Sequence, residues 1–435
     1  MTVPPKGPPG ALGPPGALGA LGPGTARVPE RLLGGSRLPP PPRIRRATRD
    51  SEIAGETASA LLYMIATGSA TNRADLARTL GLPPSTITGK ITQLLRAGLV
   101  EERGSGDPTG GRRPRVLHLR DDAGVMLAAD LGRSHARLAL LGMSGTILDA
   151  RTIPIDIGAG PDGVLALVAD ALRALVAAHG DAVVRGVGMC LPGPVDTARG
   201  MVESPASMPG WHRFDVVGWL EAEFDAVAVV DNDANMMGLG EHATLDRRAA
   251  GSRVRVGSLL FLKAGASVGC GIVINGHVHR GATALAGDIA HVRVAAAVGM
   301  PCNCGNTGCL ETIVGAGGIV TGLRASGAPV RDLPEVVRLA HDGDPRATTR
   351  LRQVGRTVGD TLAAVVNFLN PEVVVIGGML STVEPFVAAV RSQLYESCHP
   401  LATTSIRIQQ SEAGVDAGVL GIGQLCLRKA LARLY

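Results

Sequence analysis

The chain has 435 residues, of which 45% are hydrophobic and 19% charged, so it is long enough for two or three domains with buried cores. Aromatic residues make up only 2%, which argues against a nucleic-acid-binding surface of stacked aromatic rings. The first ten residues lack the apolar segment of a secretory signal, and no apolar run is long enough to cross a membrane. Seven cysteines, an odd number, argue against a secreted disulfide scaffold. We therefore expect a cytoplasmic protein with no membrane partner.

The net charge of +5 is concentrated at the front of the chain. Residues 1–50 carry eight lysines and arginines against two acids, and residues 51–120 carry nine against six. The rest of the chain is net negative, so an anionic partner is expected for the N-terminal part only, with a solubilising tail as the alternative. Residues 1–50 also hold 12 prolines and 9 glycines without a collagen period, which predicts a disordered basic tail.

Residues 51–120 are predicted to form three helices and two strands. Apolar residues recur at helical spacing in three segments: Ala58, Leu61, Leu62 and Ile65, then Leu76 and Leu80, then Ile87, Ile91, Leu94 and Leu95. Thr71 or Asn72 is expected to cap the second helix. The predicted strands are Leu99–Val100 and Arg115–Leu119, on either side of a glycine-rich loop. This order is typical of a winged helix-turn-helix DNA-binding domain.

The third helix leaves four residues off its apolar face, and these suit base edges and phosphates in a major groove: Thr86, Gly89, Lys90 and Gln93. The tip of the glycine-rich loop carries Arg112 and Arg113, which suit phosphates or a narrow minor groove. The alternative is a protein-binding helical module with a solvated basic loop. We expect a double-stranded DNA operator as partner and a homodimer or homotetramer, since such domains usually bind paired half-sites.

From Val125 onward, predicted strands and helices alternate, which indicates an α/β fold. The predicted strands are Val125–Asp130, Ala136–Leu141, Thr146–Ile153, Val184–Met189, Val227–Val230 and Val373–Ile376. The predicted helices are Val164–Ala178, a helix from Asn232, and one over about Arg346–Leu369. The pattern suggests two lobes with a cleft between them.

Three cysteines within eight residues, Cys302, Cys304 and Cys309, predict a metal site. Thiolates so close together repel one another unless a cation holds them, and Zn²⁺ binds four nitrogen or sulfur ligands in a closed tetrahedron. His291, eleven residues upstream, is the best fourth ligand; three buried structural cysteines are the alternative. The remaining cysteines are predicted to be core residues: Cys190, Cys270, Cys398 and Cys426.

Two polar turns follow apolar strands. Asp130, Gly132 and Ser134 form a strand–turn–strand that can offer N–H groups to a phosphate. Asn232 and Asp233 open a helix, where Asp233 can act as a general base for a hydroxyl and Asn232 can bind hydroxyls. A helix N-cap is the alternative, and these residues taken alone favour it.

Residues 50–435 resemble the ROK family (repressors, open reading frames and sugar kinases), specifically its regulator branch with an N-terminal winged helix. The segments that carry the resemblance are DLGRSHAR at 130–137, LPGPVD at 191–196, NDAN at 232–235, AGDIAH at 286–291, CNCGNTGCLE at 302–311 and IGG at 376–378. The resemblance implies a two-lobed actin/hexokinase-like (ribonuclease H-like) fold that binds a sugar between its lobes.

The resemblance also implies a set of sugar-binding positions: Asn232, Asp233, Asp288, His291, Glu311 and Ser207. Asp233 corresponds to the catalytic base, and His291 is shared between the zinc site and the sugar pocket. Asp288 stands where the family usually has Glu and is one methylene shorter. Ser207 stands where a sugar-binding Asn is expected, so a hydroxyl replaces an amide.

Both phosphate loops depart from the family pattern. Arg133 replaces a glycine of the first loop and adds bulk where a backbone approaches phosphate; its guanidinium can pair with Asp130 or Asp233 instead. In the second loop Ala266 lacks a hydroxyl and Ser267 adds a side chain. The vestigial nucleotide loops thus comprise Asp130, Gly132, Ser134, Gly265, Gly269, Gly377 and Gly378. These changes leave ATP a doubtful cofactor and Asp233 a vestigial base, so no active catalytic residue is expected.

Three functions are compatible with these features. The first is a DNA-binding transcriptional regulator, a repressor of carbohydrate metabolism, controlled by a sugar or sugar phosphate. The second is an active ATP-dependent sugar kinase that also binds DNA, and the third is a DNA-binding scaffold without a ligand. The winged helix and the altered phosphate loops favour the first. The expected domains are a disordered tail over 1–50, a winged helix-turn-helix over 51–120 and a sugar-sensing ROK domain over 121–435.

Overall fold

The computed structural model describes residues 57–68, 70–105, 115–120, 123–203, 208–249 and 256–433, with only the backbone described at 104 and 105. Three sequence-based predictions lie outside these ranges: the basic tail over 1–50, the pair Arg112 and Arg113, and the sugar-binding position Ser207. Within these ranges, no helix is long and apolar enough to span a membrane.

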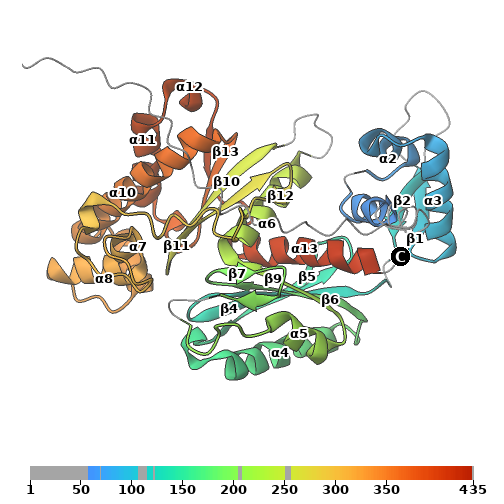
Figure 1. The fold of residues 1–435 in the computed structure, drawn as a ribbon, viewed down its shortest axis with the longest axis horizontal. Helices are drawn as coiled ribbons and strands as arrows, with labels where there is room; N and C mark the ends of the chain where they lie inside the picture. Colours follow the sequence, from blue (N-terminus) through green and yellow to red (C-terminus); the bar gives the residue numbers. More distant parts are fainter. Residues whose placement is uncertain are drawn as a thin grey trace, which may run out of the picture. The chain divides into compact units, whose positions relative to one another are not determined.

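The first described segment consists of three helices and a two-stranded hairpin (Figure 1). A helix over 57–66 is followed by α2 (Arg73–Leu80), α3 (Pro84–Arg96) and the antiparallel strands β1 (Val100–Ser105) and β2 (Arg115–Leu119). Of the two candidate caps, Asn72 is the one used, because its side chain accepts the N–H of Asp75. Gly81 ends α2 in the left-handed conformation, at φ 64°.

The predicted apolar faces of these helices are confirmed by burial. Most of the predicted apolar residues are buried in one hydrophobic cluster or beside it: Ala58, Leu61, Leu62, Ile65, Leu76, Ile87, Ile91 and Leu94. Leu80 and Leu95 are only half-buried against the same cluster. Glu102 of β1 forms ion pairs with Arg73 of α2 at 2.6 Å and Arg115 of β2 at 2.9 Å, so it ties the hairpin to the helices.

The remaining chain contains two five-stranded sheets with the same internal plan. The first has the order β5-β4-β3-β6-β9 and consists of β3 (Val125–Leu131), β4 (His135–Gly142), β5 (Ile147–Pro154), β6 (Val184–Leu191) and β9 (Val227–Asn232). The second has the order β12-β11-β10-β13-β14 and consists of β10 (Ser258–Ala264), β11 (Val268–Ile274), β12 (His277–Val278), β13 (Val373–Gly377) and β14 (Arg407–Gln410). Each is an antiparallel meander followed by two parallel strands, which is the repeat of an actin/hexokinase-like fold.

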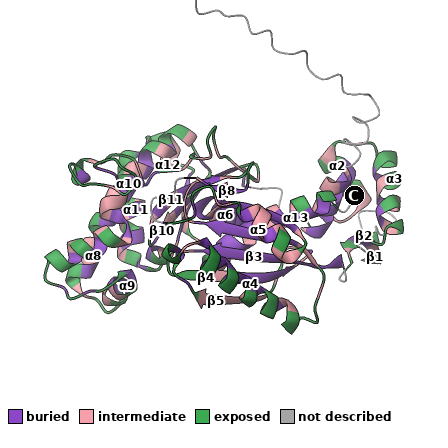
Figure 2. Cartoon of the chain, turned by 60° about the horizontal axis from the view of Figure 1, so that its bottom comes forward, coloured by how far each residue is buried: buried purple, intermediate pink, exposed green. Residues whose placement is uncertain are grey.

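Helices cover both faces of the first sheet (Figures 1 and 2). α4 (Pro161–Ala178) and α5 (Val216–Phe224) pack on one face, where Val125, Leu127 and Ala129 of β3 point. α13 (Ala417–Arg433) packs on the other face, against Met126 and Ala128. This alternation follows from the two-residue period of a strand, and it explains why β3 reads as a continuous apolar run.

The second sheet is covered in the same way. α6 (Asp233–Arg248) packs on the face of Leu259 and Phe261, whereas α8 (Ala316–Ala325), α9 (Leu333–His341), α10 (Pro345–Leu369) and α11 (Glu384–Ser397) pack on the face of Leu260 and Leu262. The other short elements are β7 (Val195–Asp196), β8 (Met201–Val202), α7 (Glu311–Val314), α12 (Pro400–Thr403), η3 (Ile157–Ala159), η4 (Ala295–Ala297), η5 (Met379–Thr382) and η6 (Gly414–Asp416). Cys190, Cys270, Cys398 and Cys426 are buried, as predicted.

Helices α6 and α13 cross with their backbones in contact. A Cβ atom on Gly421 of α13 would lie 1.9 Å from the carbonyl oxygen of Met236, and one on Gly240 of α6 would lie 1.9 Å from that of Ala417. Glycine is therefore required at both positions, despite its low helix propensity. The crossing joins the helix that begins at Asp233 to the C-terminal helix of the chain.

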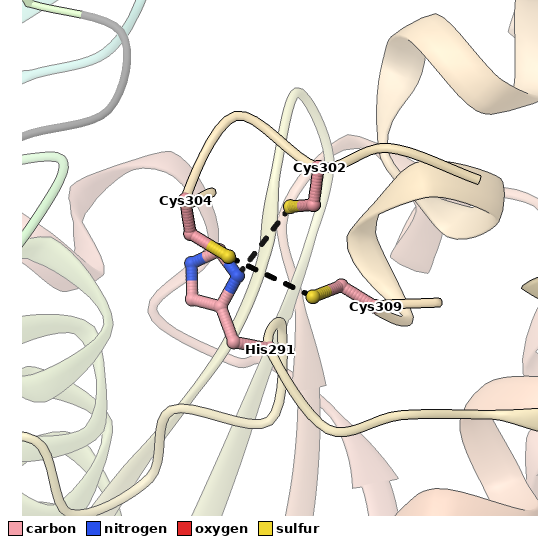
Figure 3. Close-up of side chains that lie close together, drawn as sticks. All are labelled: His291, Cys302, Cys304 and Cys309. Carbon is pink, nitrogen blue, oxygen red and sulfur yellow. Dashed lines mark hydrogen bonds between the residues drawn. The ribbon is translucent and has the colours of Figure 1, made fainter. Parts of the chain in front are cut away.

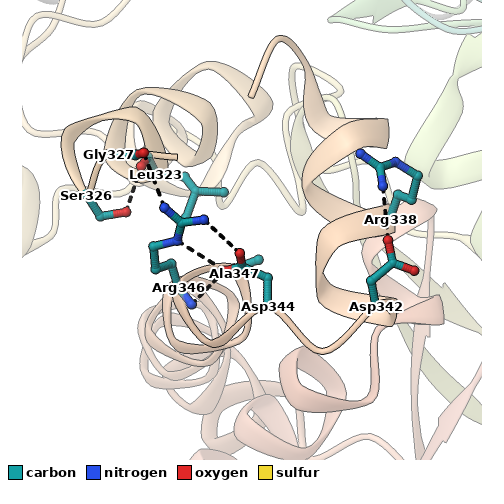
Figure 4. A network of polar contacts seen from close by, with 8 residues as sticks. All are labelled: Leu323, Ser326, Gly327, Arg338, Asp342, Asp344, Arg346 and Ala347. Carbon is teal, nitrogen blue, oxygen red and sulfur yellow. Dashed lines mark hydrogen bonds and ion pairs between the residues drawn. The ribbon is translucent and has the colours of Figure 1, made fainter. Parts of the chain in front are cut away.

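Polar contacts fix the start of the longest helix, α10 (Figure 4). Asp344 caps it by accepting the backbone N–H groups of Arg346 and Ala347, and the Arg346 side chain holds Asp344 and the carbonyl of Gly327. The Arg346 side-chain hydrogen bond contributes most to lowering the pKa of Asp344 to about 2. The same figure shows Arg338 paired with Asp342 at the end of α9.

Candidate functional site

Three charged side chains from separate elements meet in a buried cluster. Asp130 stands at the end of β3, Asp233 is the first residue of α6, and Lys263 lies near the end of β10. Asp130 and Asp233 are only 7% and 4% exposed. The Lys263 ammonium donates hydrogen bonds to the Asp233 carboxylate and, at 3.3 Å, to the hydroxyl of Ser267. An ion pair thus links the helix that follows the first sheet to a strand of the second.

Burial controls the ionisation of this cluster. It raises the pKa of Asp130 to about 7, and the neighbouring Asp233 carboxylate raises it further. Burial acts to lower the pKa of Lys263, but the Asp233 carboxylate and its hydrogen bond outweigh burial, so the pKa is raised overall. Burial also raises the pKa of Glu311 to about 7, against the opposing effects of the Val268 N–H and Lys263. At neutral pH the Lys263–Asp233 ion pair therefore lies beside two partly protonated carboxyl groups.

Replacing Asp130 with asparagine is expected to make the protein more stable above pH 7 and less sensitive to pH. Between the unfolded-state pKa of 3.8 and the folded-state pKa of about 7, the folded protein holds a proton that the unfolded chain has lost. The free energy of unfolding therefore falls as pH rises through this window and levels off above it. Asparagine removes this loss, which is up to about 4 kcal/mol at pH 8.

Thermal unfolding of wild type and Asp130→Asn from pH 5 to pH 8.5 measures this effect. Asp162→Asn, which removes an exposed carboxylate on α4, is the matched control and should follow the wild type. A pH dependence unchanged by Asp130→Asn would contradict the assignment.

Two predicted sugar-binding residues already have intramolecular partners. The Asn232 side chain caps α6 by accepting the Asn235 N–H at 3.2 Å, and its amide donates to the Gly193 carbonyl at 3.0 Å. The helix N-cap alternative is therefore correct for Asn232. Glu311, at the start of α7, accepts the N–H of Val268 at 3.0 Å and so supports the loop that contains Ser267. Asp288 is exposed, and its charge adds to the raised pKa of Glu311.

The glycines assigned to the nucleotide loops are explained by packing. A Cβ on Gly377 would lie 2.3 Å from the Phe261 ring, and one on Gly378, at φ 82°, would lie 2.4 Å from the Ala264 carbonyl. Gly265 lies beside the backbone of Met379, so the second loop and this glycine pair do come together. The fold needs Gly377 and Gly378 whether or not a nucleotide binds.

Packing restricts the glycines of the first loop and of β11 less tightly. Gly132 sits in the turn between β3 and β4, where its N–H donates to the His135 carbonyl at 2.8 Å, and Ser134 is exposed. Gly269 lies in β11, where an added Cβ would be 3.4 Å from the Cβ of Ala234. An added methyl group at Gly269 would therefore make only an ordinary contact with α6.

The expected pairing of Arg133 with Asp130 or Asp233 is wrong. Arg133 is exposed and forms no ion pair with either carboxylate, because Lys263 occupies that position. Sequence reasoning missed Lys263, although it is the one charged residue in the otherwise apolar or small segment Ser258–Ala264. A charge inside a buried strand, directly before a polar loop, was the available signal.

His291, Cys302, Cys304 and Cys309 form a second cluster, in which the four side chains point toward one another (Figure 3). Their candidate ligand atoms all lie within 4.8 Å of one another. The Cys302 sulfur is 3.7 Å from His291 Nδ1, and the Cys304 and Cys309 sulfurs are 3.7 Å apart, too far for a disulfide. Three thiols and an imidazole at these distances can hold a metal ion.

Backbone hydrogen bonds connect this cluster to the polar residues nearby. Leu310 donates its N–H to Val292 at 2.8 Å, and Glu311 donates its N–H to Ala290 at 2.9 Å. The segment around His291 is thereby held against the start of α7. A metal ion held by His291 and Cys309 would fasten the same two segments and would thus fix Glu311 relative to His291.

The predicted DNA-contacting residues of α3 lie away from the core. Thr86, Gly89 and Gln93 are exposed and Lys90 is half-buried, whereas Ile87, Ile91 and Leu94 of the same helix are buried. A Cβ added at Gly89 would meet no atom within 4 Å. Figure 2 shows this face of α3 as exposed and intermediate.

Comparison with known proteins gives one consistent family. The family model described as "ROK family" matches residues 126–429. The xylose repressor of Bacillus spizizenii is 25% identical over 374 residues, covering 85% of this chain and 94% of the repressor. The glucokinase of Halalkalibacterium halodurans is 31% identical over 316 residues, covering 69% of this chain and 94% of the kinase.

Among solved structures, a ROK family transcriptional regulator that is a homologue of the Escherichia coli Mlc protein has the same fold. Its TM-score is 0.71 at 24% identity, and the match covers 88% of this chain and 97% of that one. A family model that matches residues 126–429 spans more than half of the 435 residues. The chain is therefore a member of the ROK family.

Proposed function

We propose that this ROK protein is a DNA-binding transcriptional regulator, a repressor of carbohydrate metabolism that responds to a sugar or sugar phosphate. The observation that carries the proposal is the extent of the similarity. The repressor match covers 85% of this chain and the glucokinase match 69%, although each covers 94% of its own relative. The ROK family model begins at residue 126, so a match to 85% of the chain must include part of the segment in front of the sheets. Phosphoryl transfer has no use for such a segment.

In this proposal, residues 51–120 form a winged helix-turn-helix with α3 as the recognition helix. The exposure of Thr86, Gly89 and Gln93 on α3 supports this role, and Arg112 and Arg113 supply phosphate contacts from the wing. Residues 121–435 form the sugar-sensing ROK domain, with Asn232, Asp233, Glu311 and their neighbours as sugar ligands. A homodimer or homotetramer presents paired recognition helices to two half-sites.

We also infer that the His/Cys cluster binds one structural Zn²⁺. Two thiolates bound at about 2.3 Å in a tetrahedron lie about 3.8 Å apart, close to the 3.7 Å between the Cys304 and Cys309 sulfurs. Four N/S ligands leave no open position for a water molecule, so the ion would organise the loop rather than take part in a reaction.

An active sugar kinase that also binds DNA is the second candidate. It is favoured by the 31% identity to a glucokinase and by the presence of Asp233 at the start of α6. The Lys263 ammonium bonded to Asp233, together with the changes at Arg133, Ala266 and Ser267, argues against it.

Neutralising both wing arginines is expected to weaken operator binding and to make it less dependent on salt. Each phosphate contact adds about 0.9 to the slope of log K against log [salt], so Arg112→Ala/Arg113→Ala should lower the slope by about two. Binding is measured between 50 and 200 mM salt on a duplex selected from a random pool by the wild-type protein. An unchanged slope would count against the wing assignment.

Arg352→Ala/Arg356→Ala is the matched control, because it removes two exposed arginines from α10 in the ROK domain. It should leave the salt slope unchanged. The sensing role is tested on the same duplex with a panel of neutral and phosphorylated sugars. At least one sugar should change operator affinity in the wild type but not in Asp233→Ala, and no response to any sugar would contradict the proposal.

A further inference from the structure

A pocket of about 560 Å³ lies at the edge of the first sheet, apart from the sugar and nucleotide positions. It is formed by the turn between β7 and β8 (residues 197–200), the edge strand β9, and the end of α13. Its volume is within the range of sites that bind small molecules, which is roughly 300–1,000 Å³. Neither DNA binding nor sugar binding at Asp233 uses this pocket.

The lining of this pocket is strongly basic. It includes four basic side chains and no acidic one: Arg199, Arg280, Arg428 and Lys429. Arg280 is neutralised by Asp231, which is 1% exposed and accepts two of its N–H groups. Lys429 donates to the Ala228 carbonyl at 2.8 Å and lies 4.0 Å from Glu221. Only Arg280 has a close carboxylate partner, so the positive charge of the lining is only partly compensated.

The two remaining arginines have little or no carboxylate support. Arg199 is 69% exposed and lies 3.7 Å from Asp196, a contact that is weak in water. Arg428 forms no ion pair within 4 Å in the described part of the chain. Its Nη1 faces His277 Nδ1 at 3.5 Å, and its Nη2 lies 3.4 Å from the Gly276 carbonyl. Burial, with help from Arg428, lowers the pKa of His277, so the imidazole supplies no negative charge and accepts as a neutral ring.

Arg428 also has an unused donor. Its Nε is buried and has no hydrogen-bond partner among the described residues, although a buried donor without a partner is costly. Phosphate oxygens are suitable acceptors for such a guanidinium, because two parallel N–H groups can bind them at once. The uncompensated charge and the unpaired Nε therefore point to the same kind of ligand.

We propose that this pocket binds a small organic phosphate, with Arg428 as the principal anion-binding residue and Arg199 and Lys429 as its partners. The phosphate accepts the Nε–H and one Nη–H of Arg428 and lies over β9. Arg280, held by Asp231, borders the site and adds positive charge. The site is separate from the sugar position at Asp233, so a single chain can hold a sugar and a phosphate compound together.

The same arginine contacts the N-terminal helical segment. Arg428 Nη2 donates to the Tyr63 hydroxyl at 3.1 Å, and its guanidinium carbon lies 4.5 Å from the centre of the Tyr63 ring. Gln424, one turn earlier on α13, donates to the same hydroxyl. A phosphate that draws Arg428 into the pocket competes with Tyr63 and so weakens the contact between α13 and helix 57–66. This second step rests on the proposed DNA-binding function, whereas the binding site itself does not.

Calorimetric titration of the full-length protein at low salt tests the site. The probes are inorganic phosphate, glucose 6-phosphate, ribose 5-phosphate and the two uncharged parent sugars. Organic phosphates should bind, and Arg428→Gln and Arg199→Gln should each weaken them by at least about tenfold, the effect of losing a charged hydrogen bond. Because Arg199 is an exposed turn residue, its variant remains informative if Arg428→Gln fails to fold.

Two further variants separate a specific phosphate site from general attraction of anions to the protein. Arg352→Gln, which replaces an exposed arginine on α10, should leave phosphate affinity unchanged, whereas Tyr63→Phe should increase it a few-fold by releasing Arg428. Binding of inorganic phosphate as tightly as the organic phosphates, no phosphate binding tighter than about 1 mM, or binding unaffected by Arg428→Gln and Arg199→Gln would overturn the proposal.

The phosphate site and the regulator function fail in different ways. A protein that binds organic phosphates here but no DNA would overturn the regulator function and leave the site standing. A protein that binds its operator but no organic phosphate would overturn the phosphate site and leave the regulator function standing. If both bind, the organic phosphate should change operator affinity in wild type and not in Arg428→Gln, and equal operator affinity with and without it would refute the coupling to Tyr63.

Discussion

Replacing Cys309 with serine is expected to release the metal ion and to unfold the loop between His291 and α7. Cys309 is fully buried and stands two residues before Glu311, so a metal ion bound to its sulfur would anchor the start of that helix. Structural zinc sites contribute binding free energy directly to folding, because the unfolded chain has no preformed site. A loss of a few kcal/mol corresponds to a fall in Tm of about 10 °C in a domain of this size.

Sugar affinity should fall with the metal. His291 and Glu311 are held together by the backbone pairing of residues 290–292 with 310–311, and a metal ion in the His/Cys cluster would close the same loop. Once Cys309 is lost, Glu311 is free to leave the Val268 N–H that it now accepts. We expect at least a tenfold weaker affinity for any sugar that the wild type binds, because misplacing one ligand of a polar pocket typically costs that much.

Metal analysis and thermal unfolding of the purified protein check this prediction. Cys398→Ser, a buried cysteine outside the cluster, is the matched control and should retain one zinc ion per chain. Cys304→Ser replaces the most exposed of the three cysteines, so it should lose zinc with less damage to the fold. Wild-type protein without zinc, with its thiols freely titratable, would refute the assignment.

The parts of the fold that sequence patterns predicted are those set by local periodicity. The helix over 345–369 and the strand over 373–377 were predicted to within one residue. The helix buries one face, which gives a helical repeat of apolar residues, and the strand is buried on both faces, which gives a continuous apolar run. The His/Cys cluster was also readable, since three of its four residues lie within eight positions of one another. In both cases a short stretch of chain contains the whole pattern.

The parts that could not be predicted depend on how distant elements meet. Lys263 reaches Asp233 only because β10 of the second sheet lies against the start of α6, thirty residues earlier in the chain. Asp231 pairs with Arg280 across forty-nine residues for the same reason. The glycine pattern had two possible explanations. Gly377 and Gly378 look like phosphate-binding residues in the sequence, but packing against Phe261 and Ala264 requires them in any case.

The protein is expected to bind sugar without phosphorylating it at the rate of a kinase. Phosphoryl transfer depends on positioning and on charge stabilisation at the phosphate, and loss of one such donor costs about 10²–10³ in rate. Here the Asp233 oxygen that would accept the sugar proton already accepts the Lys263 ammonium, and Ser267 of the second loop is bound to the same lysine. We therefore expect turnover at least about 100-fold below the 1–100 s⁻¹ that is typical of kinases.

A coupled assay with ATP and each sugar that binds measures this rate. Asp130→Asn, which leaves the Lys263–Asp233 pair in place, should be as inactive as the wild type. Turnover of the wild type within the kinase range would contradict the prediction. Turnover that appears only in Lys263→Met would show that the lysine alone blocks the reaction and that the altered phosphate loops do not.

A double-mutant cycle on the free energy of unfolding measures the coupling between Lys263 and Asp233. Asp233→Asn leaves a buried ammonium without its carboxylate, and Lys263→Met leaves a buried carboxylate without its cation, so each should destabilise the protein by about 3–5 kcal/mol. The double variant contains neither charge, so its destabilisation should be smaller than the sum of the two single-variant values by at least about 2 kcal/mol. Additive costs would mean that the two side chains are not coupled in solution. If a sugar binds at Asp233, its hydroxyl competes with the Lys263 ammonium for that carboxylate, so the ion pair is the element that sugar binding would change.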